Sequence, residues 1–217
     1  MFKRLLLTLS VVLLAPLACS AQEPDVQDYV EGTHYNLIVP AVRTADPGKI
    51  EVMEFFWYGC SHCYNFEPLL SQWKQSLGED VDFRGSPAVW NQPMELHAKA
   101  YYVAEVLGVL DTMHLVLFQA MNVDKKRLGS DAELAALFEA NGVSNEDFSK
   151  ALNSFGVSSL ARQAASRAKA AKITGTPEMM VNGKYRISTR LDAVKGQGDM
   201  LKIATYLIEK ERVAVGS

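Results

Sequence analysis

The chain has 217 residues and a formal net charge of −3, with 22 lysines and arginines against 25 aspartates and glutamates. This mildly acidic balance contains no basic stripe, so it argues against a nucleic-acid-binding protein. Hydrophobic residues make up 48% of the chain, which is ordinary for a globular protein. With only three cysteines, the chain is not a small domain held together by disulfides.

Residues 1–21 have the pattern of a secretory signal peptide. Lys3 and Arg4 precede an apolar run over residues 5–17 that is too short to span a bilayer. Small residues then lead to an expected cleavage after Ala21. A retained membrane anchor is one alternative. Lipidation at Cys19 is another, because an apolar segment that ends at a cysteine resembles a lipoprotein signal.

The next segment, residues 22–90, alternates between strand and helix patterns. We expect an edge strand over 35–39, a buried strand over 50–57 and a second strand over 81–86. Between the last two, residues 61–77 predict a helix that ends at Gly78. Its expected apolar face consists of Phe66, Leu69, Leu70, Trp73 and Leu77. This order fits a βαβ unit.

The middle of the chain, residues 91–165, contains only helical patterns. Ser130 and Glu133 form a capping box, and Ser144 caps a further helix. The expected buried face of that helix is Phe148, Leu152 and Phe155. We interpret this segment as a helical subdomain inserted between strands.

Residues 166–217 return to the α/β pattern. Asn182-Gly183 lies between two short apolar runs and is a strong hairpin signal. A final amphipathic helix is expected over about 198–209. The sequence therefore predicts an α/β fold in which a helical insertion interrupts one unit, preceded by the signal peptide.

Cys60 and Cys63 carry the expected chemistry. They are the only cysteines left after cleavage at Ala21, and residues three apart share a helix face, so their sulfurs can meet. Cys60 lies at the helix start, where free N–H groups and the helix dipole favour a thiolate. We expect Cys60 to be the nucleophile and Cys63 the resolving thiol.

A metal site is the main alternative for this spacing, but zinc and iron–sulfur sites need about four ligands. His34, His97 and His114 are scattered along the chain, and we expect them to be structural or on the surface. No metal or other cofactor is therefore expected beyond the Cys60–Cys63 disulfide.

His62 and Glu54 are the expected helpers of the cysteine pair. A protonated His62 imidazole would stabilise the thiolate and make the disulfide more oxidising; the alternative is a solvated linker residue. Glu54 lies in the apolar strand, where a buried carboxyl group could relay a proton to Cys63; the alternative is a glutamate that reaches solvent. Glu67 is a weaker candidate, expected to be a surface charge.

Thr176-Pro177 follows a helix and precedes a strand, where a tight turn is needed. The local sequence leaves cis and trans forms of the Pro177 peptide bond equally open. On a thioredoxin-like scaffold this turn would lie beside the cysteines, and its backbone would pair with an extended substrate peptide.

Taken together, these motifs resemble the DsbA family of periplasmic thiol:disulfide oxidoreductases. The matching stretches are Glu54-Phe55-Phe56, Cys60-Ser61-His62-Cys63-Tyr64, Phe66-Glu67, Asn153-Ser154-Phe155, Thr176-Pro177 and Val181-Asn182-Gly183-Lys184-Tyr185. The resemblance covers essentially the whole mature chain. It implies a thioredoxin fold with a helical insertion, a cis peptide at Pro177, and Glu54 and Glu67 as acidic neighbours of the redox site.

The resemblance also implies a function and partners. The protein would introduce disulfides into unfolded exported proteins with free thiols, and a membrane quinone reductase of the DsbB type would reoxidise it. We expect a monomer. Ser61 replaces the family's usual proline and Thr176 its usual valine, so a reductase or isomerase on the same scaffold stays open. A redox-inert chaperone or a metal-binding module is the alternative from another class.

Overall fold

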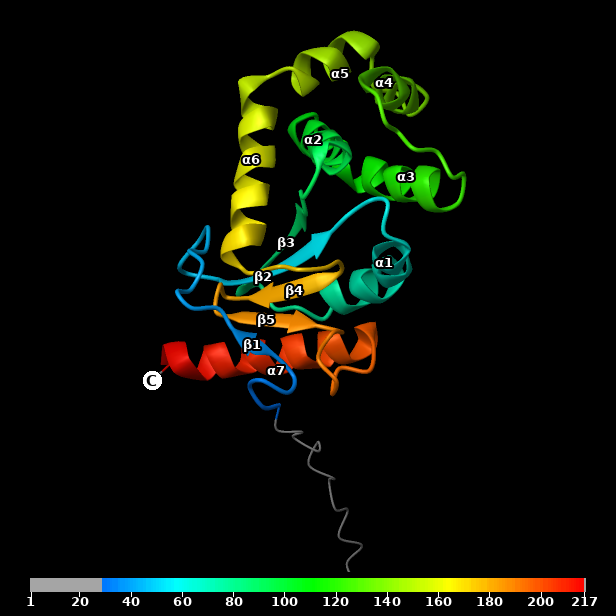
Figure 1. Cartoon of the computed structure of the whole chain (residues 1–217). Helices are drawn as coiled ribbons and strands as arrows, with labels where there is room; N and C mark the ends of the chain where they lie inside the picture. Colours follow the sequence, from blue (N-terminus) through cyan, green and yellow to red (C-terminus); the bar gives the residue numbers. More distant parts are fainter. Residues whose placement is uncertain (1–28, 217) are drawn as a thin grey trace, which may run out of the picture.

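The computed structural model describes residues 29–216, which form a five-stranded mixed sheet with helices on both faces (Figure 1). The sheet order is β1-β5-β4-β2-β3; β2 and β3 pair in parallel and the other neighbours pair antiparallel. The strands are β1 Asn36–Leu37, β2 Ile50–Phe56, β3 Val81–Pro87, β4 Glu178–Val181 and β5 Tyr185–Ser188. The helices are α1 Ser61–Lys74, α2 Gln92–Val106, α3 Leu110–Asn122, α4 Asp131–Glu139, α5 Asn145–Leu152, α6 Phe155–Ala170 and α7 Gln197–Gly216.

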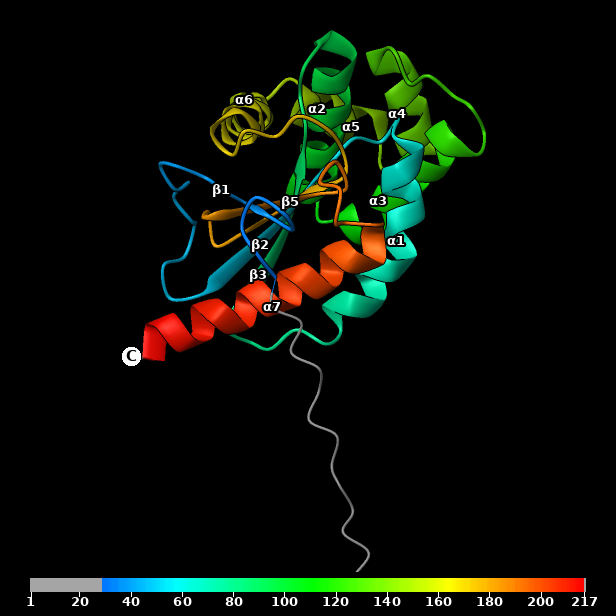
Figure 2. The same cartoon turned by 60° about the horizontal axis from the view of Figure 1, so that its bottom comes forward.

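The central strand β2 is buried along its whole length, as its aromatic and β-branched residues predicted. Its side chains alternate between the two faces of the sheet. Val52 packs in one cluster with Phe66 of α1 and Leu207 of α7. Phe55 packs on the other face with Ala168 of α6. Figure 2 shows α1 and α7 side by side on one face, with α6 on the other. Glu54, two residues from Val52, therefore faces the α1 side.

The β4–β5 hairpin confirms the turn expected at Asn182-Gly183. Both residues have positive φ angles, 49° and 67°, as a type I′ turn requires. A Cβ atom on Gly183 would lie 1.9 Å from the carbonyl oxygen of Val42, so only glycine fits there. The hairpin thereby anchors the loop that precedes β2.

Two expectations about helix faces were wrong. Leu69 lies on the outer side of α1 and is 43% exposed, and α1 ends at Lys74, before Gly78. Phe155 does not extend the buried face of α5. The Ser154 hydroxyl accepts a hydrogen bond from the Val157 N–H and starts α6 at Phe155, which turns its ring to solvent with 82% exposure.

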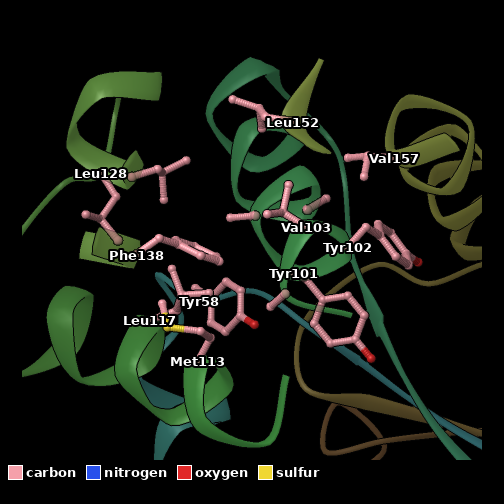
Figure 3. Close-up of a cluster of buried hydrophobic side chains, with 14 of the residues drawn as sticks. Tyr58, Tyr101, Tyr102, Val103, Met113, Leu117, Leu128, Phe138, Leu152 and Val157 are labelled. Atoms are coloured by element: carbon pink, nitrogen blue, oxygen red, sulfur yellow. The ribbon is translucent and has the colours of Figure 1, made fainter. Parts of the chain in front are cut away.

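Helices α2 to α5 and the first half of α6 surround a hydrophobic cluster (Figure 3). Burying a side chain such as Phe138 contributes roughly 1.5–3 kcal/mol to folding. Ser130 and Ser144 cap α4 and α5 as expected, each accepting a hydrogen bond from the third N–H after it. The cluster extends to Phe56, Tyr58 and Cys63, so the helical layer forms one side of the cysteine pair.

Helix α6 connects this helical layer to the sheet. Its Ala161 packs in the helical cluster, whereas its Ala168 packs against the sheet. The helix thus continues across the expected boundary at residue 165, and the exact division of the chain into an α/β unit and an insertion stays a prediction.

The expected signal peptide, residues 1–21, lies outside the described residues. Within residues 29–216 no helix is both long and apolar enough to cross a bilayer.

Candidate active site

The two cysteines lie at the junction of β2 and α1, with very different exposure. Cys60 is the N-cap residue of α1, in an extended conformation, and its side chain is half-buried. Cys63 lies one turn later and has no exposed surface. Both are free thiols in this structure and are joined by a hydrogen bond. The outer sulfur is therefore the one that a substrate can reach.

Hydrogen bonds lower the pKa of the Cys60 thiol to about 5. The largest contribution is the hydrogen bond from the Cys63 thiol, with burial opposing it. Further hydrogen bonds come from the Thr176 side chain and from the backbone N–H groups of Cys63 and His62. The free amides at the helix start contribute as the sequence predicted. Cys60 is consequently a thiolate at neutral pH.

Cys63 is perturbed in the opposite direction. Burial raises its pKa far above the ordinary value of a thiol, and its hydrogen bond to Cys60 and the nearby charges of Glu54 and Cys60 raise it further. Cys63 thus keeps its proton while Cys60 is ionised. This asymmetry suits a pair in which Cys60 attacks and Cys63 resolves.

The turn before β4 lies directly against the cysteine pair. The Thr176–Pro177 peptide bond is cis, and the Thr176 carbonyl oxygen lies 3.4 Å from the Cys60 sulfur, where it accepts a hydrogen bond from the protonated form of the thiol. Thr176 is partly exposed and Pro177 is buried. The fold therefore brings together Cys60 and Thr176, although 116 positions separate them in the sequence.

His62 is exposed at the start of α1, and its carbonyl oxygen accepts a hydrogen bond from the Gln197 side chain. The group by which His62 lowers the pKa of Cys60 is its backbone N–H. The expected effect of its imidazole stays a prediction.

Glu54 is buried, as expected, with 2% of its surface exposed. Its Oε1 atom has no hydrogen-bond partner among the described residues. Burial raises its pKa well above the ordinary value; the Glu67 and Cys60 charges raise it too, and Lys74 opposes them. A buried carboxyl group whose pKa is raised therefore lies close enough to Cys63 to affect the pKa of that thiol.

Glu67 is not the surface charge that the sequence suggested, because it is only 6% exposed. Its Oε1 atom lies 3.2 Å from Nε2 of His114, a residue of α3. His114 in turn contacts the Tyr58 hydroxyl. The sequence contained no signal for these contacts, because α3 packs against α1 only in the folded chain.

The other histidines are structural or peripheral, as expected. The His97 Nδ1 atom accepts a hydrogen bond from the Trp57 indole at 2.9 Å, and its Nε2 faces the carbonyl oxygens of Arg127 and Leu128. Burial lowers the pKa of His97. His34 accepts a hydrogen bond from the Val30 N–H within the N-terminal turn. Among residues 29–216, no group of three or more His, Cys, Asp or Glu side chains is placed to hold a metal ion.

Comparison with known proteins identifies relatives of this arrangement. A family model described as a DSBA-like thioredoxin domain matches residues 70–207. A protein of Azotobacter vinelandii named thiol:disulfide interchange protein DsbA is 39% identical over 201 residues, which is 93% of each chain. One of the same name from Pseudomonas aeruginosa is 37% identical over 212 residues, or 98% of each chain.

Solved structures agree with the sequence comparison. The crystal structure of Pseudomonas aeruginosa DsbA superposes with a TM-score of 0.83 at 38% identity, covering 88% of this chain and 99% of that one. The family match excludes the cysteines, but the sequence relatives extend across them. The expected thioredoxin-like fold with its extra helices is confirmed. This chain belongs to the DsbA family of thiol:disulfide oxidoreductases.

Proposed function

We propose that this protein acts in the periplasm as a donor of disulfides to unfolded exported proteins, with Cys60–Cys63 as the disulfide that it transfers. The observation that carries the proposal is the opposite perturbation of the two thiols: the pKa of Cys60 is lowered to about 5 while that of Cys63 is raised. Stabilising the Cys60 thiolate favours the reduced protein, and therefore makes its disulfide more oxidising.

The transfer takes two thiol–disulfide exchanges. A substrate thiolate attacks the Cys60 sulfur, the Cys60–Cys63 bond breaks, and Cys63 leaves and takes a proton. The second substrate thiolate then attacks the substrate sulfur of the mixed disulfide, which forms the substrate disulfide and releases Cys60 as a thiolate. Two electrons pass from the substrate to the protein. The low pKa of Cys60 makes it a good leaving group in the second step.

Glu54 is the proposed proton donor to Cys63. Its carboxyl group is buried and its pKa is raised, which favours the protonated form that a proton donor needs. When Cys63 leaves as a thiolate of high proton affinity, Glu54 is the acid on the adjacent strand. In reoxidation the proton returns from Cys63 to Glu54, and Cys63 attacks.

Thr176 and Pro177 are the proposed substrate-binding residues. Their peptide lies against Cys60 and is partly exposed, so an extended substrate segment can pair with its backbone while its cysteine meets Cys60. His62 is proposed to add positive charge beside the thiolate. No metal or organic cofactor enters the proposed reaction, since the exchanging sulfurs carry the electrons themselves.

Export and reoxidation complete the proposal. Residues 1–21 are proposed to be a signal peptide cleaved after Ala21, with lipidation at Cys19 as the alternative. The proposed electron acceptor is a membrane quinone reductase of the DsbB type. Mass measurement of the protein isolated from the periplasm distinguishes cleavage after Ala21 from a lipid on Cys19.

The redox equilibrium with glutathione tests the function. We expect a disulfide markedly more oxidising than the glutathione couple and a Cys60 thiolate, followed by its ultraviolet absorbance, that titrates near pH 5. A disulfide as reducing as that of thioredoxin would instead favour a reductase, for which Thr176 before the cis proline is the supporting feature. A protein that exchanges no disulfide would be a chaperone.

A further inference from the structure

A cavity of about 1220 Å³ lies between α1, β3 and helices α2, α3 and α6. Glu54, Glu67 and His114 all line it. Glu54 is nine-tenths buried, and its Oε1 atom has no partner among residues 29–216. A buried carboxyl group that borders a roomy polar space can exchange its proton with water there. The cavity is therefore a candidate route between the proposed acid of the reaction and the solvent.

His114 is held at both of its ring nitrogens. Its Nε2 atom lies 3.2 Å from Glu67 Oε1 and its Nδ1 atom 2.9 Å from the Tyr58 hydroxyl. The rings of Phe56 and Phe118 each contact the imidazole edge-on at 5.1 Å. Burial raises the pKa of Tyr58, so Tyr58 stays a neutral hydroxyl. A hydroxyl that donates to Nδ1 leaves the ring proton on Nε2, where it points at the Glu67 carboxylate.

Tyr58 is itself fixed, which makes the arrangement rigid. Its side chain is 1% exposed and packs beside Met113 and Leu117 of α3 (Figure 3). The Asn122 side chain donates to its carbonyl oxygen at 2.8 Å. Helix α3 of the helical layer thus packs against α1 and holds the His114 imidazole beside Glu67.

Solvent exposure increases from Glu54 through Glu67 to His114. Glu54 is 2% exposed, the Glu67 side chain 8% and the His114 side chain 20%. A proton that leaves Glu54 through Glu67 therefore meets progressively more solvent, and His114 is the outermost of the three. With its Nε2 atom 3.2 Å from Glu67 Oε1, the imidazole fixes the Glu67 carboxyl group at the more exposed end of these groups.

We propose that His114 is the outer end of a proton path that connects Cys63 with the cavity through Glu54 and Glu67, and that Tyr58 holds its ring in place. His114 and Tyr58 are positioning residues, since neither touches the substrate. This inference rests on the proposed disulfide exchange and adds to it the way in which the buried acid regains its proton.

The protons exchanged when Cys63 leaves the disulfide define what this path does. When Cys63 leaves as a thiolate, it takes the Glu54 proton, and Glu54 becomes a carboxylate. Water in the cavity, oriented by Glu67 and His114, then reprotonates Glu54. In reoxidation Glu54 first releases its proton to solvent along the same path and then takes the proton of Cys63. Cys63 attacks the Cys60 sulfur and expels the thiolate of the molecule bound to Cys60.

Several other titratable groups face His114 or share its cavity. Tyr101 of α2 contacts its ring at 5.9 Å, and Asp111 precedes it on α3. The remaining charged residues that line the cavity are Lys74, Asp82, Arg84, Glu105 and Arg167. Apart from Glu54 and Glu67, the lining therefore has three acidic and three basic side chains, whose formal charges balance.

The inference is tested directly by the closure step of reoxidation, in which Cys63 attacks the Cys60 sulfur and forms the Cys60–Cys63 disulfide. Reduced protein is mixed with oxidised glutathione, and stopped-flow fluorescence with acid-quench mass analysis separates Cys60 attack from closure by Cys63. We expect His114→Gln and Tyr58→Phe to slow closure about tenfold between pH 6 and 7, a modest general acid–base effect. The attack step, governed by Cys60, should change less than twofold. His34→Gln, at a histidine that does not line the cavity, is the matched control and should leave both steps unchanged.

Chemical rescue separates proton transfer from packing. In His114→Ala, free imidazole that enters the cavity should restore closure in proportion to its concentration, without altering the attack step. Selective slowing of closure together with this rescue supports the proposal. Any other combination, including equal slowing of both steps, normal closure or absent rescue, means that His114 only packs the site. If the unmodified protein forms no mixed disulfide at Cys60, the proposed exchange itself has failed.

Discussion

The Cys60 sulfur and the Thr176 carbonyl oxygen lie 3.4 Å apart, and the Thr176 side chain also hydrogen-bonds the thiolate. Residue 176 therefore contacts both the reacting atom and the surface on which a substrate strand would lie. Under the proposed substrate-binding role of Thr176, redox poise and substrate contact are coupled at this one residue.

Replacing Thr176 with valine should raise the pKa of Cys60 by about one unit, because one hydrogen bond to the thiolate is lost. A less stable thiolate makes the disulfide less oxidising. Thiolate absorbance against pH and the glutathione equilibrium measure the two effects. Thr176→Ser, which keeps a hydroxyl, is the control and should stay close to the original protein. An unchanged pKa in the valine variant would show that the Thr176 side chain does not stabilise the Cys60 thiolate.

His62→Leu should also raise the pKa of Cys60 and make the protein less oxidising. The effect should be smaller than that of Thr176→Val, because solvent and salt screen an exposed imidazolium. Titrations at low and high ionic strength check this, since the difference should shrink as salt increases. If the redox equilibrium of His62→Leu equals that of the original protein at low salt, only the backbone N–H of residue 62 acts on Cys60.

The two cysteines should give different phenotypes when replaced by serine. Cys60→Ser should abolish exchange with a peptide dithiol, because no other described thiol is exposed to attack. Cys63→Ser should trap mixed disulfides between Cys60 and substrates, since the resolving thiol is missing. Non-reducing gels and mass analysis of the trapped species measure both. Oxidation of the dithiol by Cys60→Ser would reverse the assignment of the nucleophile.

The stability of the reduced protein relative to the oxidised one should depend on pH. The folded-state pKa of Cys60, about 5, lies below that of an unfolded thiol, so the folded reduced protein binds fewer protons than the unfolded one between these values. The gain in stability that the Cys60 thiolate gives the reduced protein is complete above the unfolded pKa of roughly 8.5 and is lost as pH falls through about 5. We therefore expect reduced protein to exceed oxidised protein in stability at pH 7.

Urea unfolding of both redox forms from pH 4 to pH 8 checks the expectation, and the gap should close by pH 4. Titrating groups far from the cysteines affect both forms alike and cancel in the difference, whereas Glu54 and Cys63 respond to the Cys60 charge and belong to the measured gap. A gap that does not vary with pH would contradict the low pKa of Cys60.

Glu54→Gln should increase the free energy of unfolding and slow the closure of the Cys60–Cys63 disulfide. The folded-state pKa of Glu54 is raised, so the acid destabilises the fold as pH increases above its unfolded value of about 4.3. Glutamine has no such penalty. The variant should therefore be more stable than the original protein at pH 8 and similar to it at pH 4, while Cys63 closes more slowly. Urea unfolding and the glutathione closure rate measure the two effects, and a variant less stable at pH 8 would contradict the buried acid.

Much of the site could be predicted from the sequence, because its signals are local. Whether Cys60 and Cys63 meet depends on one turn of helix. The pKa of Cys60 is lowered mainly by the Cys63 thiol one turn away and less by the backbone N–H groups of Cys63 and His62. The Asn182-Gly183 turn and the caps at Ser130 and Ser144 likewise depend on nearby residues alone.

Only the tertiary structure decided which of the remaining side chains reach the cysteines. Glu67 was expected at the surface, but α3 covers it with His114, a residue 47 positions away. Phe155 was expected inside, but the cap at Ser154 turns it outward. Burial depends on which distant elements pack together. The periodicity of a helix in the sequence does not show which element will cover its apolar face. The local sequence thus determined the chemistry of the two sulfurs. The packing of α1 against α3 and against the turn before β4 determined which groups surround them.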